Sequence, residues 1–169
     1  MKRAEMDKFL QGPNVAKIAT VKPDGSPSVV PVWYEWQDGK LLFGGRKKSV
    51  WVEYIRKQPK IAVLIDGADP PYPKVIMEGK ARILGGDWVE MGRRMVIRYF
   101  GPELGPSYLE GSIDQPRLVV ELLPSKITTW INPPAERLEK HPYEAWHPRY
   151  YEPGTKWDAQ HKRESGHMH

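Results

Sequence analysis

Short runs of β-forming apolar residues, separated by turn residues, fill the first quarter of the chain. In the segment 14–36 such runs lie on both sides of Pro23–Ser26, whose Pro, Asp, Gly and Ser are typical of a tight turn. A second turn over 37–40 precedes the apolar run Lys40–Gly44. This pattern predicts a hairpin, with Ser28–Trp36 as its second strand, followed by a third strand.

The apolar spacing changes after this meander. Ser49 stands where a helix N-cap is expected, and Val50, Tyr54 and Ile55 form an apolar stripe at helical spacing. Pro59 bounds the helix that this stripe predicts. Helices are also predicted over 3–10 and 87–100.

Three longer runs complete the predicted strands. Ile61–Asp66 is nearly continuously apolar, as is typical of a strand buried on both faces. Lys74–Leu84 contains Gly79, which favours a bulge or bend. Arg117–Pro124 is the last long strand, and Lys126–Ile131 continues it after a kink. Six strands, mostly antiparallel, predict a mainly β fold: a closed antiparallel barrel with helical insertions, and not an alternating parallel sheet.

The end of the chain has a different composition. Prolines at 133, 134, 142 and 148 favour an extended segment, because proline continues neither a helix nor a central strand. The last residues, 161–169, contain three histidines but are typical of a disordered terminus. We therefore predict a barrel domain over residues 1–132, an extended tail with a disordered end over 133–169, and no metal site.

Composition narrows the function classes. The 169 residues include no cysteine, which excludes disulfides, thiolate catalysis and cysteine-bound metal centres. The net charge is +5, but the basic residues are scattered, which argues against a nucleic-acid partner. No apolar run reaches the length of about 18 residues that a membrane span needs. The first ten residues lack the apolar core of a signal peptide, so we expect a cytoplasmic protein without membrane association.

The segment 44–51, GGRKKSVW, carries the strongest candidate chemistry. Its glycines allow a ligand to approach the backbone, and Arg46, Lys47 and Lys48 supply positive charge. A helix that begins after Ser49 offers free N–H groups to an anion. We interpret the segment as a phosphate-binding turn; a solvated basic turn before an ordinary helix is the alternative that the residues leave open.

Two further candidates are weaker. The aromatic strand 31–36, PVWYEW, could form the wall of a site for a flat ring, although core or interface packing explains it as well. Lys74 could reach a phosphate or a ring oxygen, and a plain strand-end lysine is the alternative. Glu35, Glu53 and Glu78 have no spacing typical of a paired acid and base, so hydrolase chemistry is poorly supported.

Four stretches taken together resemble the pyridoxamine 5′-phosphate oxidase-like, flavin-binding split-barrel superfamily. They are an opening hairpin at 17–36, a strand–turn–helix–strand unit at 41–66, a strand at 70–84 and closing strands at 117–130. The resemblance runs from about Met6 to Ile131, and its specificity lies in the order and spacing of all four stretches.

This resemblance implies a six-stranded antiparallel split barrel that forms a homodimer, with two cofactor sites lined by both subunits. The ring system would lie against Val30–Trp33, and the ribityl phosphate against the turn at 46–51. The candidate cofactor-binding residues are Val30, Pro31, Val32, Trp33, Arg46, Lys47, Lys48, Ser49, Trp51 and Lys74.

The chain departs from the oxidase pattern in two places. The oxidases have a consecutive Arg-Lys pair where this chain has Val50 and Trp51, and a glutamine where it has Lys74. The sequence is therefore more similar to bacterial and archaeal relatives that use FMN or the deazaflavin F420. We expect an FMN-binding oxidoreductase that transfers hydride between the flavin and an unknown small molecule. The alternatives are an F420-dependent reductase and a non-catalytic flavin- or haem-binding protein, and we name no catalytic residue.

Overall fold

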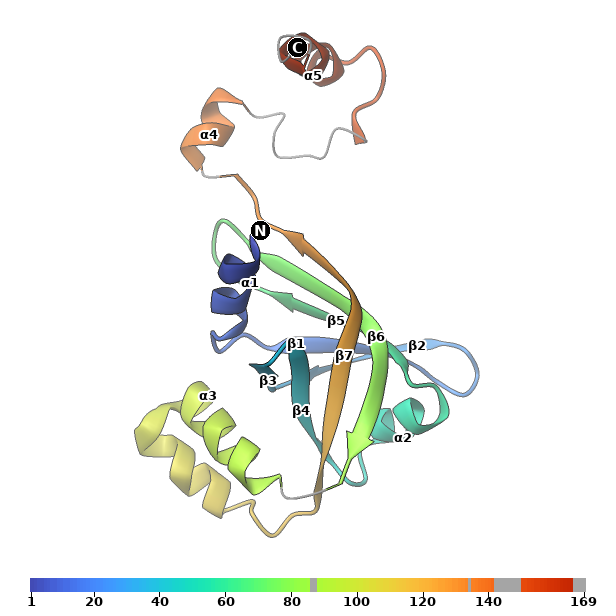
Figure 1. Cartoon of the computed structure of the whole chain (residues 1–169), viewed down its shortest axis with the longest axis vertical. Helices are drawn as coiled ribbons and strands as arrows, with labels where there is room; N and C mark the ends of the chain where they lie inside the picture. The colour runs from blue at the N-terminus through green and yellow to red at the C-terminus, as the bar shows by residue number, and fades with distance from the viewer. Residues whose placement is uncertain (86–87, 134, 142–149, 166–169) are drawn as a thin grey trace. The chain divides into compact units, whose positions relative to one another are not determined.

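The computed structural model describes residues 1–85, 88–133, 135–141 and 150–165. The chain divides into two compact units (Figure 1). Unit 1 consists of Met1–Ala68 and Pro73–Trp130, and unit 2 of Asp69–Tyr72 and Ile131–His169.

Unit 1 is built around one antiparallel sheet in the order β2-β1-β5-β6-β7-β4-β3. The predicted mainly β, split-barrel architecture is confirmed, but the sheet has seven strands and the sequence predicted six. The strands are β1 (Ala16–Val21), β2 (Pro27–Val32), β3 (Tyr34–Gln37), β4 (Lys40–Arg46), β5 (Lys60–Asp66), β6 (Lys74–Leu84) and β7 (Arg117–Trp130).

The additional strand arises because the predicted strand Ser28–Trp36 is divided at Trp33. The part before Trp33, β2, pairs with β1, and the part after it, β3, pairs with β4. These two strands are the opposite edges of the sheet, yet a single residue joins them. The sheet must therefore curl until its edges meet at Trp33, which gives a barrel closed by the chain itself instead of by hydrogen bonds (Figure 1).

Alternating side chains fill the barrel interior. Along β4, Leu41 and Phe43 point inward and are fully buried, and on β3 Tyr34 is also fully buried. Each buried apolar side chain of this size contributes about 1.5–3 kcal/mol relative to an exposed one. Other fully or almost fully buried members of the core are Leu10, Ile18, Val52, Ile55, Val63, Ile65, Val75, Met77, Val120 and Leu122.

The long pair β6–β7 contains a bulge. The register shifts between Glu78 and Gly79, so that Ser125 has no partner in the ladder and its hydroxyl donates a 3.0 Å hydrogen bond to the Glu78 carbonyl. A Cβ atom at Gly79 would lie 2.7 Å from the carbonyl oxygen of Leu123. The predicted bulge at Gly79 and kink after Pro124 are both confirmed.

A helical hairpin, α3 (Val89–Glu110), packs beside β3 and β4 (Figure 1). Gly101, with φ 81°, interrupts the helix and divides it into two halves, whereas the sequence predicted a helix only over 87–100. Arg94 and Arg98 fasten the first half to the barrel. Arg94 makes two hydrogen bonds of 2.6 and 2.9 Å to the Glu35 carboxylate. Arg98 donates to the carbonyl oxygens of Leu10, Gly12 and Tyr34.

Unit 2 contains two helices, α4 (Ala135–Lys140) and α5 (Lys156–Ser165), where the sequence predicted an extended tail. Pro133 and Pro153 precede these helices instead of interrupting them, so the proline-rich composition does not oppose short helices between the prolines. Within α5, Lys162 forms a 2.8 Å ion pair with Asp158. Disorder was predicted for 161–169, but residues 161–165 belong to α5, and 166–169 lie outside the described residues.

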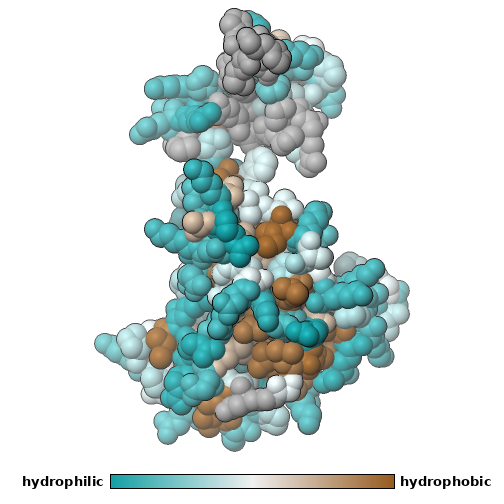
Figure 2. All heavy atoms as spheres, in the orientation of Figure 1, coloured by the Kyte–Doolittle hydropathy of each residue, from teal (hydrophilic) through white to brown (hydrophobic). Residues whose placement is uncertain are grey.

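Polar and charged side chains surround exposed apolar groups on the visible face of unit 1 (Figure 2). Within the described parts of the chain, no helix is both long and apolar enough to cross a membrane.

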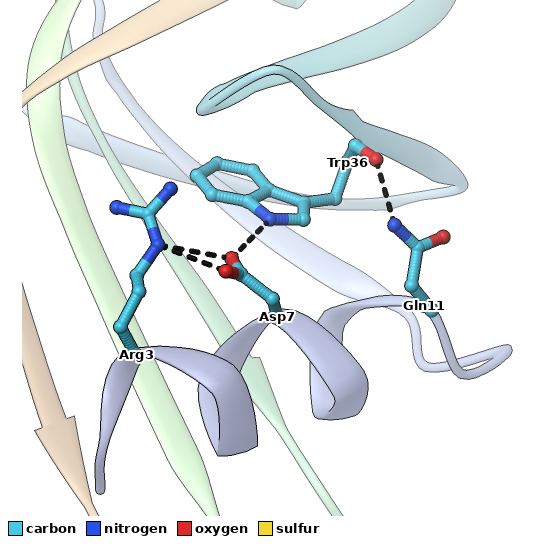
Figure 3. Close-up of polar contacts among 4 residues, drawn as sticks. All are labelled: Arg3, Asp7, Gln11 and Trp36. Carbon is cyan, nitrogen blue, oxygen red and sulfur yellow. Dashed lines mark hydrogen bonds and ion pairs between the residues drawn. The ribbon is translucent and has the colours of Figure 1, made fainter.

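The helix α1 (Arg3–Leu10), confirmed as predicted, is attached to β3 through Asp7 and Trp36 (Figure 3). The indole N–H of Trp36 donates a 2.8 Å hydrogen bond to Asp7, and the Arg3 guanidinium binds the same carboxylate at 3.0 Å. Gln11 donates a further 3.1 Å hydrogen bond to the Trp36 carbonyl. The hydrogen bond from Trp36, followed by the one from Arg3, lowers the pKa of Asp7 below its ordinary value.

We predict that Asp7→Asn destabilises the protein at neutral pH but not in acid. Because the folded-state pKa of Asp7 is lowered, its contribution is present above the unfolded-state pKa of about 4 and is lost as the pH falls through the folded value. The expected loss is about 1 kcal/mol at pH 7, the typical size of one such hydrogen bond. Urea unfolding at pH 7 and near pH 3 measures it. Glu103→Gln, at an exposed position on α3, is the control, and a constant difference at both pH values would contradict the prediction.

Candidate functional site

A pocket of about 870 Å³ lies in unit 1 between the barrel and the α3 hairpin. Its walls come from β2, the end of β4, the beginning of α2 (Val50–Lys57) and both halves of α3. Seven of the ten predicted cofactor-binding residues line it: Val30, Pro31, Val32, Trp33, Arg46, Ser49 and Trp51.

The first wall is the edge strand β2. Every residue from Ser28 to Trp33 lines the pocket. Val30 and Val32 are partly buried against the barrel core, whereas Val29 is 65% exposed. Because β2 pairs only with β1 in the described sheet, its other edge leaves backbone N–H and C=O groups beside the pocket. The predicted role of Val30–Trp33 as the wall of a ring site is compatible with this placement.

Trp33 is held in an aromatic cluster. Its ring stacks on Tyr99 with centroids 4.8 Å apart and planes at 8°, and it meets the edge of Phe100 at 5.1 Å. Tyr108, from the second half of α3, lies 5.7 Å from Trp33 and 4.7 Å from Phe100. The Tyr99 hydroxyl also donates a 2.7 Å hydrogen bond to the Asn14 carbonyl. Trp33 therefore has one ring face covered by Tyr99, and its position is fixed by α3.

Two arginines also line the pocket. Arg46 ends β4 and Arg117 begins β7, and the two are direct partners in the antiparallel ladder. Arg117 lies with its guanidinium 4.7 Å from the ring of Trp88, and its Nε is buried without a hydrogen-bond partner. Burial lowers the pKa of Arg117 below its ordinary value, and the charge of Arg46 acts in the same direction.

Arg117 is not among the site residues predicted from the sequence. Nothing in its local sequence separates it from other arginines at strand ends. Its significance depends on the β4–β7 register, which places it opposite Arg46.

Ser49 and Trp51 connect the pocket to α2. Ser49 is the N-cap residue, as predicted, but its side chain makes no capping hydrogen bond, so its hydroxyl remains available on the pocket side. Trp51 is only 9% exposed and packs against Gly45, where a Cβ would lie 2.8 Å from the indole. Gly45 therefore allows α2 to pack closely on β4 and brings its first turn to the pocket.

Three predicted residues do not line the pocket. Lys47 and Lys48 are exposed in the turn beyond Arg46. Lys74 is exposed at the beginning of β6, between Asp66 of β5 and Trp130 of β7. The structure thus brings one of the four predicted cations into the pocket.

The α3 side of the pocket is apolar. Met91, Met95 and Leu109 are buried and line it. Among the described lining residues, Arg46 and Arg117 are the only charged ones, and there is no carboxylate or histidine. Such a pocket can bind an elongated, largely apolar ligand with an anionic end, but its described residues offer no acid–base pair for chemistry of their own.

Comparison with known proteins identifies the family. The sequence profile of a domain described as pyridoxamine 5′-phosphate oxidase matches residues 3–131. The chain belongs to the pyridoxamine 5′-phosphate oxidase family. The resemblance seen in the sequence is therefore confirmed, and the match covers the barrel and α3. A comparison with curated proteins finds no match.

Solved structures similar to this family member share its fold. The Mycobacterium tuberculosis protein Rv2991 is 25% identical, with a TM-score of 0.67 over 78% of this chain and 85% of that one. An F420 reductase is 23% identical, with a TM-score of 0.59 over 72% of this chain and 94% of that one. An FAD-binding protein from Mesorhizobium loti is 21% identical, with a TM-score of 0.55 over 76% of this chain and 92% of that one. At these identities the last two show the fold alone.

We predict that Gly105→Ala distorts the pocket by separating the two halves of α3. A Cβ at this buried position would lie 2.8 Å from the backbone carbon and oxygen of Val96, which cannot move without shifting the helix. Overpacking of this kind costs about 1–3 kcal/mol, which thermal unfolding would detect. The control is Gly111→Ala at the end of the same helix, where the nearest atom is 3.6 Å away. Equal stability of the two variants would contradict this account of α3.

Proposed function

We propose that this protein is a flavin-dependent oxidoreductase that binds FMN in the pocket between β2, α2 and α3. The observation that carries the proposal is the lining of the pocket, which combines two arginines with aromatic and apolar side chains and with the edge strand β2. FMN has the same division into a flat ring system and a terminal phosphate. Membership of a family of flavin-associated proteins supports this choice.

The residues present fit the group. Arg46 and Ser49 would hold the phosphate together with the first N–H groups of α2. The free edge of β2 would donate hydrogen bonds to the heteroatoms of the ring, and the side chains of Val30 and Val32 would contact its surface. Trp33, fixed by Tyr99, would limit how far the ring extends toward α3.

A bound flavin supplies hydride transfer, so the protein needs to provide binding, orientation and exclusion of water. This explains why the described lining contains no acid–base pair. The buried side chains of Met91, Met95 and Leu109 would exclude water from one side. The substrate would be a small molecule that lies against the exposed part of the ring.

We also propose that a second copy of the chain completes the site. Val29 and Val50 line the pocket, yet they are 65% and 61% exposed. Exposed apolar side chains at the opening of a site are typical of a surface that a partner covers. A homodimer would bury both valines and close the open side of the pocket.

The cofactor proposal predicts that the purified protein binds FMN one to one with its chains. The test is absorption of the purified protein, followed by titration with FMN and, in parallel, with F420 and haem. The two visible bands of an oxidised flavin support the proposal. The single visible band of a deazaflavin would assign the F420 reductase alternative, and an intense Soret band would assign haem. Failure to bind any of the three would overturn the proposal.

The dimer proposal predicts that Val29→Asp converts the protein to a monomer, because a charge would be buried without a partner in the interface. Light scattering coupled to size-exclusion chromatography measures the mass. Leu123→Asp is the matched control, since Leu123 is 58% exposed on β7 and does not line the pocket. A monomeric wild-type protein, or dimers of equal stability in both variants, would refute the shared site.

A further inference from the structure

Arg46 and Arg117 place two positive charges side by side in the lining of the pocket. They are direct partners in the β4–β7 ladder, so their side chains project from the same face with Cβ atoms about 5 Å apart. Like charges in this position destabilise a sheet. Neither arginine forms an ion pair with any residue that the structure describes.

Some other cations of the same sheet are paired with carboxylates. Farther along β7, Glu121 is 4% exposed and receives Lys40 from β4 at 3.2 Å and Arg82 from β6. Arg94 is likewise paired with Glu35. Lys60 and Lys80 are also direct partners in the β5–β6 ladder and form no ion pair with a described residue, but both lysines are exposed. Arg117 differs from them because it is partly buried and its Nε has no hydrogen-bond partner.

Arg117 is also held in place. Its guanidinium lies over Trp88 at 4.7 Å, and its Nε is buried without a partner. Burying a hydrogen-bond donor that has no partner costs free energy, and the cost is larger when the donor belongs to a charged group. The protein thus keeps two neighbouring cations, of which Arg117 is partly buried and Arg46 is exposed, beside a cavity that both arginines line.

We propose that Arg46 and Arg117 form a two-arginine clamp for a dianionic phosphate monoester, and that the repulsion within this clamp is relieved when the phosphate binds. This inference rests on the proposed function and adds Arg117 as the residue that the phosphate bridges to Arg46. Two planar guanidinium groups can each bind two oxygens of one phosphate, and two positive charges match its charge at neutral pH. The N–H groups at the beginning of α2, next to Ser49, complete the donor set.

The clamp is tested by comparing FMN with riboflavin, which has the same ring but no phosphate. Flavin fluorescence titration of Arg46→Met and Arg117→Met is expected to show FMN affinity reduced by about ten- to a hundredfold, the usual effect of losing hydrogen bonds to a charged group. Riboflavin affinity should stay unchanged. Methionine at 117 keeps apolar contact with Trp88. Lys47→Met, which removes an adjacent exposed cation outside the pocket, is the matched control and should behave as wild type.

The free protein provides an independent measurement. Arg46→Met removes the repulsion, so its thermal midpoint without ligand should rise by about 2–4 °C, whereas Lys47→Met should leave it unchanged. If both arginine variants lose equal affinity for FMN and for riboflavin, the two arginines do not act through the phosphate and have only a structural role. Unchanged FMN affinity would overturn the clamp.

The failure of the proposed function can be distinguished from the failure of the clamp. If the wild-type protein binds neither FMN nor riboflavin, the flavin proposal fails, and inorganic pyrophosphate then becomes the probe. A clamp predicts that pyrophosphate raises the thermal midpoint of the wild-type protein and of Lys47→Met, but not of Arg117→Met. No pyrophosphate-dependent rise in the wild-type protein would overturn the clamp as well.

Discussion

The connection between β2 and β3 is one residue long, and the rest of unit 1 depends on this short link. Two consecutive Cα–Cα steps span less than about 8 Å, so the first and last strands of the sheet cannot separate at Trp33. The five strands between them must bridge the remaining circumference, which forces the sheet to curl. The buried alternation on β4 and the central strands then follows from the barrel interior that this curling creates.

The position of the pocket follows from the same link. Trp33 sits where the two edges meet, and the α3 hairpin covers it with Tyr99, Phe100 and Tyr108. The pocket between the hairpin and the barrel is lined in part by β2. In the same pocket, the β4–β7 register brings Arg46 and Arg117 together. The short link and this register thus place apolar side chains and two arginines in a single cavity.

Features that depend on local chemistry could be predicted from the sequence. The helix at 3–10, the bulge at Gly79 and the N-cap position of Ser49 each follow from residues within one or two turns of chain. Features that depend on how the strands pair could not be predicted from the sequence. The break at Trp33 is invisible in the apolar pattern, because β-forming residues continue across it from Val32 to Trp36 and the two strands are separated only by their pairing partners. Arg117 lies beside Arg46 in the β4–β7 ladder, although the two residues are 71 positions apart in the sequence (117 − 46). No local feature of the sequence indicates that they pair. In the tail, the helices α4 and α5 were missed because proline was taken to exclude helix throughout the segment, whereas neither helix contains a proline.

The prolines of β2 have a consequence for what can reach its open edge. Pro27 and Pro31 both lack an N–H group, so the backbone cannot present an unbroken row of donors along the strand. An extended polypeptide that tried to join the barrel as an additional strand would find gaps in the hydrogen-bonding ladder. A small rigid ligand needs only one or two donors, so the missing N–H groups do not weaken its binding. The prolines therefore protect this edge against aggregation and leave it accessible to a small ligand.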